Sequence, residues 1–308
     1  GVIGIADALA DTPLEPAQRE LVDTITASAS ALLAIINDVL DLSKVEAGRL
    51  TLAEEPFDPA KAIDEVAELL APSARAKGIE IVADVDPGLP ARVRGDAGRV
   101  RQCLLNLMGN AVKFTHEGHV LIGAARGADG RLVFQVEDSG VGIPEDRLDA
   151  IFSAFEQADT RSTRAFEGTG LGLAITRRLA GLMEGSVSAS SRPGGGSVFT
   201  LRLALPEVAG AGEARAAPDL GAARRALVVD PLAASRRALA RRLRAWGIET
   251  ETVADAAEAG RLLAAASGDG IDLVLSADPP GRSSLLRPGG PPPALVFLCG
   301  DGTGAARP

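Results

Sequence analysis

The first 50 residues carry a helical pattern of apolar positions. Residues 1–10 can form a short helix, residues 11–13 favour a turn, and a longer helix is predicted from about residue 15 to residue 47. Apolar side chains recur along the longer helix at alternating spacings of four and three, which is typical of helices that pack lengthwise on one another. This stripe consists of Leu21, Ile25, Ser28, Leu32, Ile35, Val39 and Leu42, with Ser28 as its one polar exception, and a second stripe of Val22, Ala29, Leu33, Ile36 and Leu40 widens it. Because a hairpin cannot cover so wide a face, the pattern predicts either a four-helix bundle with a second copy or packing onto the downstream domain.

From about residue 50 to residue 206 the pattern changes to a mixture of helical and alternating segments. We expect helices near 59–76 and 99–114, and strands near 79–84, 119–126, 131–137 and 197–204. The helix over 99–114 has one apolar face, formed by Val100, Leu104, Leu107 and Ala111. This mixture predicts an α+β two-layer sandwich.

The remaining sequence contains a linker and a third unit. Residues 207–222 are rich in Ala, Gly, Glu and Pro without periodicity, which is typical of a linker. From residue 223, short apolar strands alternate with helices, which predicts an α/β unit with a parallel, doubly wound sheet. We therefore divide the chain into a helical hairpin (1–49), an α+β domain (50–206), a linker (207–222) and an incomplete third unit (223–308).

Composition narrows the classes of function. The 32 basic and 41 acidic residues give a net charge of −9, and aromatic residues are scarce, so binding to nucleic acid or an anionic membrane is not expected. We expect no transmembrane segment, because the apolar runs end short of about 18 residues. The two cysteines, Cys103 and Cys299, exclude a disulfide framework, and no signal segment opens the chain. These features favour a cytoplasmic location.

A row of polar residues follows the other face of the helix over 99–114. Asn106, Asn110 and Lys113 lie on this face at helical spacing. Amide oxygens are hard ligands that suit Mg²⁺, and a lysine neutralises phosphate oxygens. The row therefore predicts a magnesium and phosphate site, with a solvated helix face as the alternative.

Two glycine-containing segments offer further candidate ligands. Asp138 follows an alternating strand and opens the run DSGVGIP (138–144), so its carboxylate can accept a hydrogen bond from an exocyclic amine such as that of adenine. The alternative is an ordinary turn with a capping aspartate. Downstream, GTGLGL (168–173) precedes a helix, and its backbone amides can cradle phosphates. Alone, such a run is a weak signal.

Taken together, these segments resemble a known family. Five of them match the ATP-binding domain of sensor histidine kinases in order and spacing: NLMGNAVKFT (106–115), DSGVGIP (138–144), FSAFEQAD (152–159), GTGLGLAI (168–175) and GGGSVF (194–199). The helical hairpin, which includes ALLAIINDVLDLSKVEAGRL, resembles the dimerisation and phosphotransfer hairpin of hybrid histidine kinases. The third unit resembles a receiver domain of the flavodoxin-like fold. The resemblance covers essentially the whole chain.

The resemblance implies ATP and Mg²⁺ as cofactors, and it assigns residue roles. It implies that Asn110, assisted by Asn106, holds Mg²⁺, and that Lys113 and Arg164 contact phosphate. It places Phe114 beside the adenine, whose amino group Asp138 reads, and it gives Gly140 and Gly142 a close backbone approach to the base. The phosphate lid is implied to consist of Gly168, Thr169, Gly170, Leu171 and Gly172.

The phosphoacceptor histidine of this family is not in the chain. The chain contains only His116 and His119, in a predicted turn, whereas the family carries the acceptor on the first helix, here upstream of Gly1. The resemblance therefore implies autophosphorylation of an upstream histidine and transfer to a receiver aspartate. The alternatives are a non-catalytic, nucleotide-sensing scaffold and, within the same fold, an ATPase of the gyrase and mismatch-repair type. The implied partners are a second copy of the chain and a receiver domain or phosphotransfer protein.

The third unit departs from the receiver pattern. Its first strand ends with one acid, Asp230, where receivers have two, and Ala277 stands at the acceptor position with Asp278 one residue later. A shift of one residue reverses a side chain's direction in a strand, so Asp278 is a poor substitute. Cys299 stands near the usual Ser or Thr. We therefore expect a pseudo-receiver that regulates by docking.

The first helix of the third unit is rich in arginine. Its arginines are Arg236, Arg237, Arg241, Arg242 and Arg244. They are interpreted either as a solvated helix face, or as a docking face for the acidic body of the protein or for an anionic second messenger such as a cyclic dinucleotide.

Overall fold

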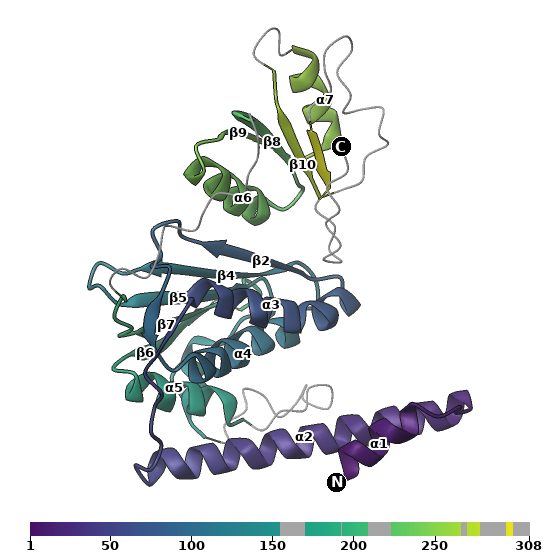
Figure 1. Cartoon of the computed structure of the whole chain (residues 1–308), viewed down its shortest axis with the longest axis vertical. Coiled ribbons are helices and arrows are strands. Elements are labelled where there is room, and N and C mark those ends of the chain that lie inside the picture. The colour runs from purple at the N-terminus through teal and green to yellow at the C-terminus, as the bar shows by residue number, and fades with distance from the viewer. Residues whose placement is uncertain (155–169, 192, 209–222, 266–269, 278–293, 298–308) are drawn as a thin grey trace.

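The computed structural model describes residues 1–154, 170–191, 193–208, 223–265, 270–277 and 294–297. Three parts follow one another along the chain (Figure 1): a pair of helices, a larger domain with a five-stranded sheet, and a smaller domain with a four-stranded sheet. All three were expected from the hydrophobic pattern.

The N-terminal part is a helical hairpin. Helix α1 (Val2–Ala10) leads through a turn, in which the Thr12 hydroxyl donates to the carbonyl of Leu9, into the long helix α2 (Pro16–Glu46). Val22 is buried, but most large apolar side chains of α2 are not covered by the described residues. Those exposed are Leu21, Ile25, Leu32, Leu33, Ile35, Ile36, Val39 and Leu40.

Helix α2 bears on the expectation that no segment spans a membrane. Its segment Pro16–Asp41 is long and apolar enough to cross a membrane by length and composition. Its run without charged side chains, residues 24–37, is shorter than the roughly 18 residues on which the expectation was based. Length and composition alone do not separate such a helix from one that packs in a bundle.

The central domain is the expected α+β two-layer sandwich. Its sheet has the order β2-β4-β5-β7-β6, with β2 parallel to β4 and the other pairs antiparallel. The strands are β2 (Glu80–Val85), β4 (His119–Arg126), β5 (Leu132–Asp138), β6 (Ser186–Ser191) and β7 (Ser197–Leu203). Helices α3 (Pro59–Ala76), α4 (Ala97–Phe114) and α5 (Gly172–Leu182) lie on one side of it (Figure 1). Short elements complete the domain: β1 (Glu55–Phe57) paired with β3 (Val93–Gly95), η1 (Glu145–Arg147) and η2 (Ala150–Phe152).

Helix α4 is central to this domain. The Asp96 side chain caps its N-terminus by accepting from the backbone N–H of Arg99 at 2.9 Å. Its predicted apolar face is fully buried and belongs to the same core as Phe134 and Ile122 of the sheet. The opposite, polar face of α4 is thereby left available for the site.

The third part is a four-stranded parallel sheet in the order β11-β10-β8-β9. It consists of β8 (Arg225–Val229), α6 (Ala233–Ala245), β9 (Glu249–Val253), α7 (Ala256–Ala265), β10 (Leu273–Ser276) and β11 (Ala294–Phe297). Strand β8 is buried on both faces: Val228 packs in the cluster of α6 residues, and Leu227 in that of α7 residues. This is the parallel arrangement that the alternation of strands and helices predicts.

Backbone contacts define the end of the central domain, and a side-chain contact joins it to the third part. Residues 207 and 208, which composition assigns to the linker, belong to the central domain, because Glu207 bridges to Val93 and Val208 donates to the carbonyl of Arg92. The rest of that linker lies outside the described residues. Helix α6 of the third part packs against the edge strand β2, where Arg241 Nη1 lies 3.3 Å from Asp84 Oδ2.

Candidate functional site

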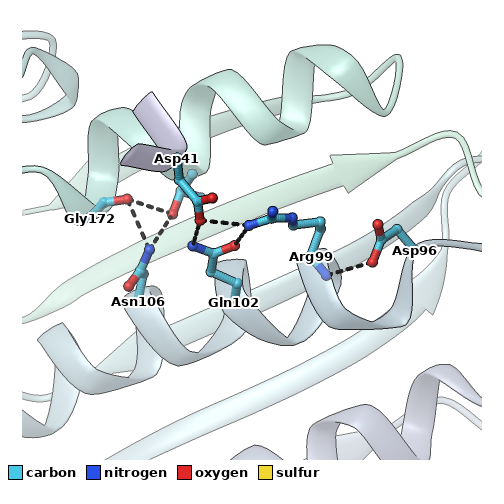
Figure 2. Close-up of polar contacts among 7 residues, drawn as sticks. Asp41, Asp96, Arg99, Gln102, Asn106 and Gly172 are labelled. Carbon is cyan, nitrogen blue, oxygen red and sulfur yellow. Dashed lines mark hydrogen bonds and ion pairs between the residues drawn. The ribbon is translucent and has the colours of Figure 1, made fainter. Parts of the chain in front are cut away.

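In the middle of α4, a residue of its polar face hydrogen-bonds to α5. Asn106 Nδ2 donates to the carbonyl of Gly172 at 3.1 Å and lies 3.4 Å from the Thr176 hydroxyl (Figure 2). Gly172 packs closely here, because a Cβ at this position would lie 3.3 Å from the Asn106 side chain. Asn106 therefore joins two helices through its amide nitrogen, which sequence reasoning did not foresee. A role for its oxygen toward Mg²⁺ stays a prediction.

The C-terminal end of α4 carries the other two residues of the predicted row. Asn110 and Lys113 are both partly buried, one helical turn apart. Partial burial lowers the pKa of Lys113, and the positive charge of Lys77 lowers it further. The Lys113 Nζ lies 5.0 Å from the centre of the Phe114 ring, within cation–π distance. Lys113 thus presents an ammonium group beside an aromatic ring, one helical turn after the amide of Asn110.

Lys77 fixes this end of α4 and was missed by sequence reasoning. From the end of α3, its Nζ donates to the carbonyls of Val112 and Lys113, each at 2.8 Å, and to that of Thr115 at 3.4 Å. The last carbonyls of a helix have no partner within the helix, so a lysine here satisfies them and opposes the negative end of the dipole. No sequence motif marks a single lysine for this role.

Asp138 is held at the end of β5 in a buried position. Its side chain is 6% exposed, and Oδ1 accepts from the backbone N–H of Gly140 at 2.9 Å. Burial raises the pKa of Asp138, although hydrogen bonds from Gly140 and Ser197 oppose the rise. Gly140 is required at its position, since a Cβ would lie 2.5 Å from the carbonyl of Phe114. Asp138, Gly140 and the end of α4 are therefore brought together, as the sequence predicts.

The glycine-rich turn over residues 194–196 packs against the backbone of Asp138 and the loop that follows it. Gly194 donates its backbone N–H to the carbonyl of Val141 at 2.7 Å. Gly196 has a φ of +77°, and a Cβ there would overlap the carbonyl of Asp138. The Ser191 hydroxyl accepts from Ile143 and donates to the carbonyl of Gly196, each at 2.7 Å. These contacts fix the loop that carries Asp138, and Gly142 in that loop also has a positive φ of +73°.

The predicted lid is described only at its C-terminal end. Gly170 has a φ of +67°, and Leu171 is buried in the core, so only its backbone is available to a ligand. Gly172 begins α5 beside Asn106. The other predicted residues of this segment, Arg164, Gly168 and Thr169, lie outside the described residues.

These residues together suit a nucleoside triphosphate. Asp138 offers a buried acceptor for a base amine, while Asn110 and Lys113 offer ligands for magnesium-bound phosphates at the end of α4. Among the described residues no group of three or more His, Cys, Asp or Glu can hold a metal. This donor set fits Mg²⁺ that keeps waters and binds phosphate oxygens, since Mg²⁺ in nucleotide sites uses few protein ligands.

Comparisons with known proteins match two regions of the chain. A model of the His Kinase A (phospho-acceptor) domain matches residues 1–48, and one of the histidine kinase-, DNA gyrase B-, and HSP90-like ATPase matches residues 95–207. The signal transduction histidine-protein kinase BarA of Escherichia coli (strain K12) is 44% identical over 209 residues, which are 67% of this chain and 23% of BarA. The sensory/regulatory protein RpfC of Xanthomonas campestris pv. campestris is 41% identical over 208 residues, which are 66% of this chain and 29% of RpfC.

A solved structure is similar along almost the whole chain. The crystal structure of full-length ShkA in complex with AMPPNP matches with a TM-score of 0.76 and 37% identity, covering 96% of this chain and 60% of ShkA. The chain spans about a quarter of the length of the curated relatives, 23% of BarA and 29% of RpfC. The ATPase model alone includes gyrase-type enzymes, and the phospho-acceptor match separates this chain from them. The chain therefore belongs to the histidine kinase family, by its phospho-acceptor region and its ATPase domain.

Proposed function

We propose that this chain is the kinase core of a cytoplasmic two-component phosphorelay. It binds ATP with Mg²⁺, transfers the γ-phosphoryl group to a histidine and passes it on to a receiver aspartate. The observation that carries this proposal is the combination of a phospho-acceptor hairpin with an ATPase domain in which the loop after Asp138 lies against the end of α4, the helix that carries Lys113.

Each site residue has a definite task in this reaction. Asp138 accepts the hydrogen bond of the adenine amino group, and the glycine-shaped loop beside it lets the base approach the backbone. Asn110 supplies an oxygen toward Mg²⁺, which would neutralise charge on the phosphate oxygens. Lys113 adds a positive charge; bound phosphate favours its protonated form and so opposes the lowered pKa. Phosphoryl transfer of this kind depends mainly on positioning and charge neutralisation.

We place the acceptor histidine upstream of Gly1, on the same helix as α1. The phospho-acceptor match covers residues 1–48, a stretch without histidine. His116 lies instead between α4 and β4, and His119 is the first residue of β4, both in the central domain. The backbone N–H of His119 donates to the Ser139 hydroxyl at 2.9 Å, which ties this turn to the Asp138 loop. Both histidines therefore belong to the central domain, and neither lies in the phospho-acceptor hairpin.

The test is autophosphorylation of the chain extended upstream through this histidine, with radiolabelled ATP and Mg²⁺. We expect acid-labile label that is lost in Asn110→Ala and strongly reduced in Asp138→Asn, while both variants keep the melting temperature of the parent within a few degrees. The matched control is Asn37→Ala, an exposed asparagine of α2. ATP binding without label in the parent would favour the nucleotide-sensing scaffold and overturn the kinase.

We further propose that residues 223–308 are a pseudo-receiver that regulates the kinase by docking. The Asp230 carboxylate is 1% exposed and is used within the fold: Oδ1 accepts from Leu232 N–H at 2.7 Å and Oδ2 from the Ser235 hydroxyl at 2.6 Å. These bonds favour a structural use of this acid over a metal site. Ala277, after β10, offers no nucleophile, and Asp278 and Cys299 lie outside the described residues. Deleting residues 223–308 from the extended chain is expected to raise the label.

A hollow beside α6 favours a ligand for this unit. It has a volume of about 520 Å³ and is lined by Ala233, Arg236, Arg237, Ala240, Arg241, Arg244 and Thr252. Four arginines around one hollow suit a compact ligand with two phosphates, and we propose a cyclic dinucleotide. Calorimetric titration should show binding that Arg237→Ala weakens at least severalfold. Equal binding of the linear dinucleotide or of sulfate would indicate general anion binding and contradict the proposal.

A further inference from the structure

A polar cluster away from the nucleotide residues joins the hairpin to the ATP-binding domain. Asp41 of α2 accepts, through Oδ2, from Arg99 Nη1 at 2.6 Å and from Gln102 Nε2 at 3.0 Å. Arg99 Nη1 also donates to Gln102 Oε1 at 2.7 Å, so the three side chains close a ring (Figure 2). We call Asp41, Arg99 and Gln102 the Asp41 clamp.

The Asp41 clamp contains a partly buried ion pair between Asp41 and Arg99. The side chains of Asp41 and Arg99 are only 15% and 27% exposed, so their charges are partly withdrawn from water. Burial alone would raise the pKa of Asp41, but the hydrogen bonds from Arg99 and Gln102 outweigh it and hold the pKa below its ordinary value. The carboxylate is therefore ionised at neutral pH, and charge-assisted hydrogen bonds of this kind are directional and strong.

The clamp acts on the helix that carries the nucleotide residues. Its two partners in the central domain begin a row along α4 that continues, at spacings of three and four, with Asn106, Asn110 and Lys113. The first two residues of the row, Arg99 and Gln102, hydrogen-bond to the hairpin. Asn106, in the middle, hydrogen-bonds to α5, and the last two residues belong to the proposed phosphate site. A rise of 1.5 Å per residue puts Arg99 and Lys113 about 20 Å apart along the axis.

The N-terminal end of α4 is held firmly enough to transmit this contact. Asp96 caps the helix at Arg99, and its second oxygen accepts from the backbone N–H of Ala53 at 3.1 Å, in the segment that connects the hairpin to the domain. Helix α2 also packs against α5. Because α4 is buried along its other face and fixed within its domain, the bonds from Asp41 hold the central domain as a whole to the hairpin.

We propose that Asp41 is a positioning residue for phosphoryl transfer, which it serves by holding Arg99 and Gln102 so that α4 presents the bound nucleotide toward the hairpin. The inference rests on the proposed kinase function and names a residue that function does not include. Phosphoryl transfer between a nucleotide on one domain and a histidine on another depends on their mutual placement, and small misplacements cost large factors in rate. Asp41 has no contact with nucleotide in this role.

The test measures initial rates of autophosphorylation against ATP concentration in the chain extended upstream through the acceptor histidine. For Asp41→Ala we expect kcat to fall by roughly ten- to a hundredfold. KM for ATP and the affinity for a fluorescent ATP analogue should change less than about twofold. Arg99→Ala should behave alike, and the double variant should be no worse than either single one, because both remove the same contact.

Three further variants separate positioning from a general effect on folding. The exchange Asp41→Arg with Arg99→Asp restores an ion pair and should recover most of kcat, since an acid in the first turn of α4 is tolerated. Asp23→Asn removes a carboxylate from an exposed position of the same helix and should leave kcat unchanged. Asp41→Asn keeps the size of the side chain and should give an intermediate kcat with an unchanged melting temperature.

The outcomes distinguish the clamp from the kinase itself. No label in the unchanged extended chain would overturn the proposed function. Label in the unchanged chain with an unaltered or increased kcat in Asp41→Ala and Asp41→Asn would overturn the clamp and leave the kinase standing. A rise in KM for ATP with unchanged kcat would also overturn it, because it would place Asp41 in nucleotide binding.

Discussion

At the scale of single residues, the glycine-rich turn behind Asp138 allows a matched comparison. Gly194 and Gly196 both have positive φ, +71° and +77°, but a Cβ meets nothing within 4 Å at Gly194 and overlaps the Asp138 carbonyl at Gly196. Each alanine pays about 1–2 kcal/mol for the left-handed conformation. Gly196→Ala must in addition move the loop, so we expect a larger loss of unfolding free energy, by about 1–3 kcal/mol, and weaker ATP binding. Equal losses in urea unfolding would contradict the clash.

Asp138 itself makes stability depend on pH. Because burial raises its pKa, the folded state holds the proton more tightly than the unfolded chain, and this contribution to stability is lost as the pH rises through the raised value. We expect Asp138→Asn to be progressively more stable than the parent protein between about pH 4 and pH 7. Urea unfolding across this range measures the difference. Glu137→Gln, at the exposed neighbouring position, removes only the smallest contribution to the raised pKa of Asp138 and should show a much smaller trend, and a constant difference for Asp138→Asn would refute the assignment.

At the scale of elements, the end of α4 depends on a lysine from another helix. Lys77→Ala leaves three carbonyls at that end without the ammonium group, so we expect a loss of about 1–2 kcal/mol of unfolding free energy. It should also raise KM for ATP, because Lys113 and Asn110 lie on the last turns. Lys61→Ala is the matched control on α3, since its side chain is 72% exposed and lies 4.0 Å from Glu65. Equal effects of the two variants would show that Lys77 does not cap α4.

The same helix shows how far sequence reasoning extends. The 3.6-residue period predicted both faces of α4, because periodicity is a local property of the chain. It could not predict that Asn106 bonds Gly172 or that Asp41 bonds Arg99, since these partners are 66 and 58 residues apart and meet only through the fold. Lys77 and Ser191 belong to no motif and were missed for the same reason. Composition likewise placed residues 207 and 208 in the linker, although their backbone pairs with the central domain.

At the scale of the whole molecule, the exposed face of α2 predicts a dimer. Its apolar residues, including Ile25 and Leu32, are 47% and 58% exposed in the single chain, and exposed apolar patches on soluble proteins often mark an interface. We expect light scattering to give twice the chain mass, and Leu32→Glu to give the monomer. Leu69→Glu, a leucine of α3 that is 64% exposed, should leave the dimer intact. A monomeric parent protein would contradict the four-helix bundle.

The contact of the third unit with strand β2 predicts a second, pH-dependent association within the chain. Arg241 pairs with Asp84 at 3.3 Å, and near it Glu80 faces Asp230, Ser235 and Arg242. Arg241→Glu places a second negative charge next to Asp84, and the repulsion should open the contact and increase the radius of gyration in X-ray scattering. Arg237→Glu, at an exposed position of α6, should leave the radius of gyration unchanged.

The sign of the pH effect on this contact follows from Glu80. Burial, together with the charge of Asp230, raises the pKa of Glu80, so the docked arrangement favours its protonated form and weakens as the pH rises through the raised value. The radius of gyration of the parent protein should therefore increase with pH, and Glu80→Gln should remove most of that increase. The double exchange Asp84→Arg with Arg241→Glu should restore docking, because it rebuilds the ion pair with the charges reversed. An Arg241→Glu protein as compact as the parent would show that other contacts hold α6 on β2 and that this ion pair does not control the third unit.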